Sequence, residues 1–85
     1  MAKNYKSSVH ALTTSFAPVK AADPNRSLLI LTNQDAANAI QVAFGLDTAY
    51  ITVAPGATLV LHEAPGNLIR AKGAAGTPNL TVIVA

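Results

Sequence analysis

Apolar and polar residues alternate along much of the chain in short segments that glycine or proline separates from one another. Residues 39–44 are the clearest example, because Ile40, Val42 and Phe44 alternate with small or polar residues. A period of two residues is typical of a β-strand with one buried face. Helical periodicity is poor throughout, so the pattern predicts a chain built from strands.

The predicted strands cover residues 9–20, 27–33, 39–44, 50–53, 58–63, 68–71 and 80–84. About seven short strands at this spacing are expected of an all-β fold, either a small antiparallel β-sandwich or a jelly-roll-like barrel. We therefore expect a flexible, extended N-terminal arm over residues 1–8 and a single β-sandwich domain over residues 9–85.

Two proline-glycine pairs mark predicted turns at residues 54–57 and 64–67. Proline presets the first central dihedral of a type II turn, and glycine accepts the positive φ of the second. Because type II turns splay the strands of a hairpin, we expect both turns to carry the chain from one sheet to the other.

Residues 27–33 are apolar on both sides of the predicted strand. Such a strand is buried on both faces, at the centre of a covered sandwich or at a subunit interface. Alternation along the strand gives two possible faces for a partner to cover, and the pattern does not choose between them. One face carries Leu28 and Ile30, and the other carries Leu29 and Leu31.

The composition limits how this fold can be stabilised. A hydrophobic share of 51 % with 12 % charged residues excludes a disordered chain, and an aromatic share of 5 % predicts a thin core. The chain has no cysteine, and His10 and His62 lack the spacing of metal ligands. Without a disulfide, metal or cofactor, so small a domain is expected to bury surface against copies of itself or a larger body.

The charges are too few for a nucleic-acid site. Six basic and four acidic residues give a net charge of +2, and only Lys3 and Lys6, on either side of Tyr5, form a small basic group. The longest aliphatic run, residues 28–31, is far shorter than the ~20 residues of a membrane helix. No apolar stretch follows the first lysines, so we expect no secretory signal and no membrane or nucleic-acid partner.

The catalytic motifs that we sought are missing, so we expect no enzyme and no small-molecule substrate. No serine lies in a Gly-x-Ser-x-Gly turn, and the loop from Gly73 to Gly76 lacks the Lys-Ser or Lys-Thr of a phosphate site. His62 and Glu63 are neighbours on a predicted strand and point to opposite faces. Arg26 stands before the most apolar strand, where it can tie a loop, pair with Glu63 or Asp47, or reach a neighbouring subunit.

Residues 25–33, 38–45, 51–56 and 76–82 resemble, in that order, the small β-sandwich structural proteins of tailed bacteriophages. Members of this family commonly decorate or cement the capsid. The resemblance implies a capsid decoration protein on the outer surface of the virion, assembled in the host cytoplasm and stabilising the shell. Its implied partners are the major capsid protein and further copies of the chain in a dimer or trimer.

On this resemblance, six residues are expected to contact the capsid or another protomer. Lys3, Tyr5 and Lys6 belong to the arm, which would drape over the shell with Tyr5 as its apolar anchor. The others are Arg26, Leu28 and Ile30, at and just before the doubly apolar strand.

Two alternatives remain open. The same sandwich suits a tail, baseplate or head-fibre module that uses loops 34–38 and 73–78 to contact another tail protein or a cell-surface glycan. A small carbohydrate-binding module would instead stack Tyr50 or Tyr5 on a sugar ring, although neither tyrosine has another aromatic residue beside it in the sequence.

Overall fold

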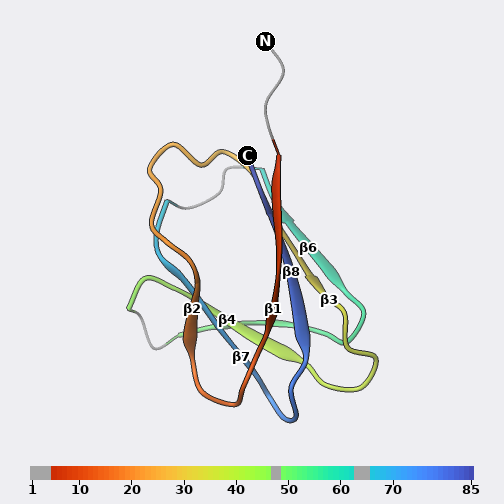
Figure 1. Ribbon diagram of the computed structural model, residues 1–85. Coiled ribbons are helices and arrows are strands. Elements are labelled where there is room, and N and C mark those ends of the chain that lie inside the picture. The colour runs from red at the N-terminus through yellow and green to blue at the C-terminus, as the bar shows by residue number, and fades with distance from the viewer. Residues whose placement is uncertain (1–4, 47–48, 63–65) are drawn as a thin grey trace.

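The computed structural model describes residues 5–46, 49–62 and 66–85, and within these the chain forms strands and no helix (Figure 1). The strands are β1 (Lys6–Ala11), β2 (Ala17–Lys20), β3 (Leu29–Asn33), β4 (Ile40–Phe44), β5 (Ile51–Val53), β6 (Thr58–Leu61), β7 (Ile69–Gly73) and β8 (Asn79–Val84). All pairs are antiparallel. The expected all-β fold is confirmed.

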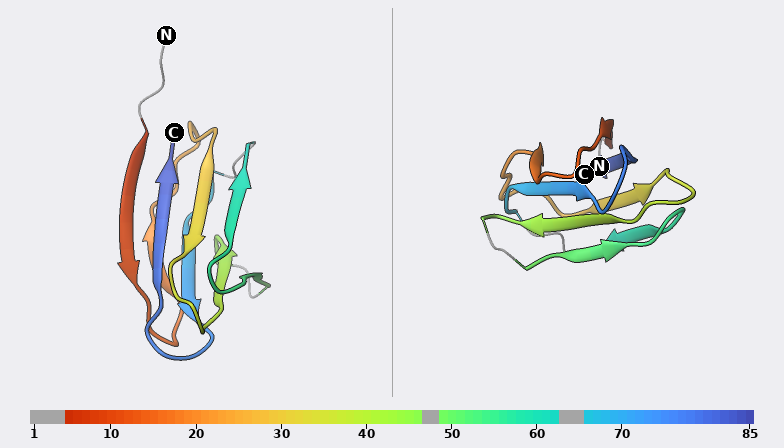
Figure 2. Two further views of the ribbon diagram at one scale, coloured as in Figure 1. Left: turned by 90° about the vertical axis from the view of Figure 1, so that its right-hand side faces the viewer. Right: turned by 90° about the horizontal axis from the view of Figure 1, so that it is seen from below.

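The strands form two four-stranded sheets. Sheet A has the order β1-β8-β3-β6, whose strands lie side by side in the left view of Figure 2, and sheet B has the order β2-β7-β4-β5. The chain pairs as a nested hairpin, β4 with β5, β3 with β6, β2 with β7 and β1 with β8, and successive pairs alternate between the sheets. This strand order is that of a jelly roll.

Two boundaries differ from the sequence expectation. The segment 9–20 is not one strand, because the chain turns at residues 12–16 and places β1 in sheet A and β2 in sheet B. The arm expected over residues 1–8 is also too long. Lys6, Ser7 and Ser8 pair with residues 82–84 of β8, whose edge would otherwise lack hydrogen-bond partners.

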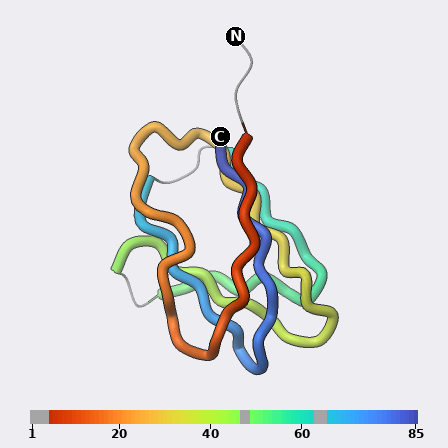
Figure 3. Tube along the Cα trace, in the orientation of Figure 1, coloured from red at the N-terminus to blue at the C-terminus, as the bar shows by residue number. Residues whose placement is uncertain are grey.

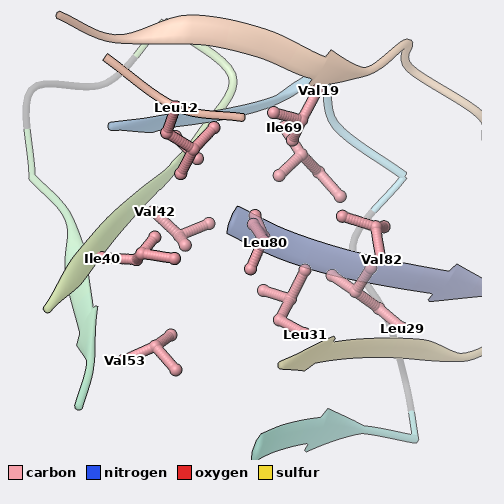
Figure 4. Close-up of a cluster of buried hydrophobic side chains, with 11 residues drawn as sticks. Leu12, Val19, Leu29, Leu31, Ile40, Val42, Val53, Ile69, Leu80 and Val82 are labelled. Carbon is pink, nitrogen blue, oxygen red and sulfur yellow. The ribbon is translucent and has the colours of Figure 1, made fainter. Parts of the chain in front are cut away.

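The core lies between the sheets and is aliphatic (Figure 4). Leu29 and Leu31 of β3 face Ile40 and Val42 of β4 across it, and none of the four has exposed surface. Burying each such side chain stabilises the fold by roughly 1.5–3 kcal/mol. The remaining core residues are Leu12, Val19, Val53, Ile69, Ala71, Leu80 and Val82.

The connections between β5 and β6 and between β6 and β7 both cross from one sheet to the other. At the first crossing, the N–H of Ala57 donates to the carbonyl of Ala54 at 3.0 Å, and Gly56 has a φ of 72°. These features confirm the predicted proline-glycine turn. The second predicted turn includes residues 64 and 65, which lie outside the described part of the chain.

One buried polar side chain joins the two sheets where their strands end. The Asn33 side chain has no exposed surface, and its Nδ2 donates to the carbonyls of Asn38 at 2.9 Å and Val53 at 3.1 Å. Its Oδ1 accepts a hydrogen bond from the N–H of Asp35 at 2.9 Å. Asn33 therefore fixes the end of β3 against the start of β4 and the end of β5.

The next loop is held by a carboxylate. Asp35 Oδ1 accepts from the backbone N–H groups of Ala37 at 2.7 Å and Asn38 at 2.9 Å. These two donors lower the pKa of Asp35 below its ordinary value. The loop between β3 and β4 is therefore ordered by its own residues, and it lies at the end of the molecule opposite the N-terminus (Figure 3).

Candidate functional site

The outer face of sheet A carries rows of side chains that run across all four strands. Ser7, Ile83, Ile30 and Val60 are in register, and we call the last three the aliphatic row. Their neighbours along the strands, Leu29, Leu31 and Val82, fill the core, so alternation directs the aliphatic row away from it.

The adjacent row of the same face consists of Val9, Thr81, Thr32 and Thr58 in register. Its hydroxyls are bonded to neighbouring side chains, since Thr32 and Thr58 lie 3.0 Å apart and Gln34 Nε2 donates to Thr81 at 3.1 Å. Because these hydroxyls already have partners, covering the row costs less than burying free hydroxyls would. The two rows together form what we call the apolar face.

No Asp, Glu, Lys or Arg in the four strands of sheet A belongs to the apolar face, because Lys6 alternates to the opposite side. Val9 is 66 % exposed and Val60 is 43 % exposed. The structure thus settles which face of residues 27–33 is core. Leu29 and Leu31 are buried, whereas Ile30 and the preceding Leu28 keep partly exposed side chains.

The outer face of sheet B is different in character. Arg70 and Lys72 alternate with the buried Ile69 and Ala71 of β7, and both cations therefore point outward. The ring of Phe16, from the loop before β2, lies against both of them. The Arg70 guanidinium carbon is 5.2 Å from the ring centroid and Lys72 Nζ is 4.9 Å from it.

Tyr50 completes this group, with its ring centroid 6.1 Å from that of Phe16 and the two planes inclined by 48°. We call Phe16, Gln41, Tyr50, Arg70 and Lys72 the basic face. Tyr50 has no aromatic neighbour in the sequence, but the fold gives it one in space, because the jelly roll brings the loop before β2 close to the start of β5. The alternation of Arg70 and Lys72 was the one sequence signal for this face.

The residues expected in the arm have separate positions. Tyr5 is 64 % exposed and lies just before β1. Lys6 lines a hollow between the edge strands together with Lys20 and Arg26. Lys3 lies outside the described residues.

Arg26 is 7 % exposed, and it ties loops of its own domain. Its guanidinium donates to the carbonyls of Ala21 at 2.8 Å and Asn67 at 3.1 Å. This geometry agrees with the loop-tying alternative and leaves little surface for contact with another subunit. A pairing with Glu63 or Asp47 falls outside the part of the chain that the structure describes.

His10 occupies the same edge of the sandwich. Its Nε2 lies 2.9 Å from the hydroxyl of Ser8, two residues earlier on β1. Partial burial lowers the pKa of His10 below its ordinary value, and the positive charge of Lys20 lowers it further. Among residues 5–46, 49–62 and 66–85, no three His, Asp or Glu side chains are grouped as metal ligands would be.

No family model, curated protein or solved structure matches this chain. Within the described ranges, no helix is long and apolar enough to cross a membrane.

Proposed function

We propose that the protein is an accessory structural protein of a tailed-bacteriophage head, which binds the outer surface of the capsid as a homo-oligomer and stabilises the shell. The apolar face of sheet A carries this proposal. It extends over four strands with aliphatic and threonine side chains and has no charged side chain from those strands. A face of this composition is suited to being covered by protein.

The composition of the apolar face supports self-association. In a two-fold dimer the same patch meets itself, so it must be complementary to its own copy. Aliphatic rows meet this requirement without bringing like charges together. Their burial also adds apolar contact to a domain whose fully buried core is aliphatic, with Phe44 packed against it as a partly buried ring.

The resemblance of residues 25–84 to capsid decoration proteins supports the assignment to a phage head. A tail, baseplate or head-fibre module could use the same apolar face, and the number of copies per particle separates the two functions. The Phe16 and Tyr50 pair favours a carbohydrate-binding module as the second candidate. Its rings, however, are inclined by 48° and do not form one flat stacking surface.

The experiment that tests the proposal is quantitative mass spectrometry of purified virus particles, with the major capsid protein as internal reference. A decoration protein scales with the shell, so we expect a copy number that is a fixed, sizeable fraction of the capsid protein. A few copies per particle would move the protein to the tail or a vertex. Absence from particles would refute the structural role.

A further inference from the structure

We propose that the basic face of sheet B is a second docking surface, and that its partner is a protein segment bearing carboxylate side chains. This inference goes beyond the proposed function, because it assigns a separate partner to a separate face. It rests on the geometry of Phe16, Lys72 and their neighbours on β4 and β5.

Lys72 supplies the positive charge at the centre of this surface. Within the described residues its ammonium group contacts the ring of Phe16 and no carboxylate. The two acidic residues that the structure describes are engaged in their own turns, since Asp23 Oδ1 accepts from the N–H of Asn25 and Asp35 orders its loop. Lys72 is therefore a charge held in a defined position by an aromatic ring and still able to bind an anion.

Further hydrogen-bond donors stand beside that charge. Lys72, Gln41 and Thr52 are in register across β7, β4 and β5, with neighbouring strands about 4.8 Å apart. The Gln41 amide and the Thr52 hydroxyl have no hydrogen-bond partner among the described residues. An ammonium, an amide and a hydroxyl in one row can together bind the oxygens of carboxylate side chains.

The charge of this face opposes a second copy of the chain as its occupant. Two copies meeting face to face would gather Arg70 and Lys72 of both in one interface, and like charges there weaken association. The apolar face has no such repulsion. Because the two faces are on opposite sides of the sandwich (Figure 2), one can contact another copy while the other binds an acidic partner.

The arrangement also favours protein over sugar or nucleic acid. Both cations lie against the Phe16 ring, so they compete with a sugar for stacking on it. Two cations neutralise too few phosphates to hold a nucleic acid at moderate salt. By contrast, tyrosine and arginine are typical anchors of protein interfaces.

The test measures the binding of a fluorescein-labelled poly-glutamate peptide to the purified 85-residue chain by fluorescence anisotropy. We expect binding that weakens with salt and that Lys72→Gln reduces roughly tenfold, the effect of losing one charge-assisted hydrogen bond. Lys20→Gln is the matched control, because it removes the same charge from the hollow beside β1. It should change the affinity less than about twofold.

Three outcomes would overturn the proposal. They are no binding of the peptide, equal losses in the two variants, and tighter Lys72-dependent binding of single-stranded oligothymidylate than of poly-glutamate. Circular dichroism of Lys72→Gln must match that of the parent, and Lys72→Arg should retain the affinity. Because the assay uses free protein, its result is independent of the copy number in particles.

Discussion

Two neighbouring residues of β3 provide a direct test of which face is core and which is interface. Leu31 has no exposed surface and packs between the sheets, whereas Ile30 lies in the aliphatic row on the outer face. We predict that Leu31→Asp prevents folding. Ile30→Asp is expected to leave a folded domain that has lost self-association.

The magnitudes follow from burial. Truncating a fully buried leucine to alanine lowers the free energy of unfolding by roughly 2–5 kcal/mol. An aspartate at the same position lowers it further, because its charged carboxylate must be transferred from water into the apolar core. A chain of 85 residues has a total stability of roughly 4–13 kcal/mol, so Leu31→Asp removes most or all of it. At Ile30, on the outer face, the carboxylate keeps its access to water, and the cost is the lost strand propensity together with the lost burial of a partly exposed side chain, roughly 1–2 kcal/mol.

Urea unfolding followed by far-ultraviolet circular dichroism measures the first effect, at a protein concentration low enough to keep the parent monomeric. Light scattering coupled to gel filtration measures self-association at high concentration. Ile30→Thr is the control, because it keeps the branched side chain and a threonine-like surface. If Ile30→Asp unfolds the domain, our assignment of the two faces is wrong. If it folds and still associates like the parent, the interface lies elsewhere.

Two further predictions concern the buried side chain of Asn33 and the partly buried side chain of His10. Asn33→Ala should lower the free energy of unfolding by roughly 2–4 kcal/mol, since the carbonyls of Asn38 and Val53 lose their buried donor. Thermal unfolding checks this, and a shift no larger than that of a surface substitution would contradict it. The lowered pKa of His10 means that the folded state binds its proton less readily than the unfolded state, so stability is lost as the pH falls below about 6.5. His10→Gln should remove this part of the pH dependence, and an unchanged profile would show that His10 is not its source.

Local patterns predicted the parts of the fold that depend on neighbouring residues. The alternation of Ile40, Val42 and Phe44 located β4, and Pro55 with Gly56 located the turn between the sheets. The segment 27–33, which is apolar on both sides, located β3, the strand whose outer face we assign to an interface. In each case the relevant interactions lie within a few residues, where period and turn chemistry carry the information.

The features that sequence reasoning missed depend on distant contacts. Residues 12–16 continue a loose alternation, so nothing local shows that β1 and β2 belong to different sheets. Phe16 meets Arg70 and Tyr50 only after the chain has folded back on itself. Arg26 likewise donates to the backbone carbonyls of Ala21 and Asn67. Every residue has a carbonyl, so the sequence does not show which carbonyls the fold places beside the guanidinium.

The nested strand order also governs when the protein can fold. β8 lies between β1 and β3, so until residues 79–84 have been synthesised β1 has no neighbour and β3 has only β6. Almost every pairing closes a long loop of chain, which slows folding relative to proteins with local contacts. Sheet A can therefore be completed only after its last strand has left the ribosome, and until then β1 and one edge of β3 lack their hydrogen-bond partners.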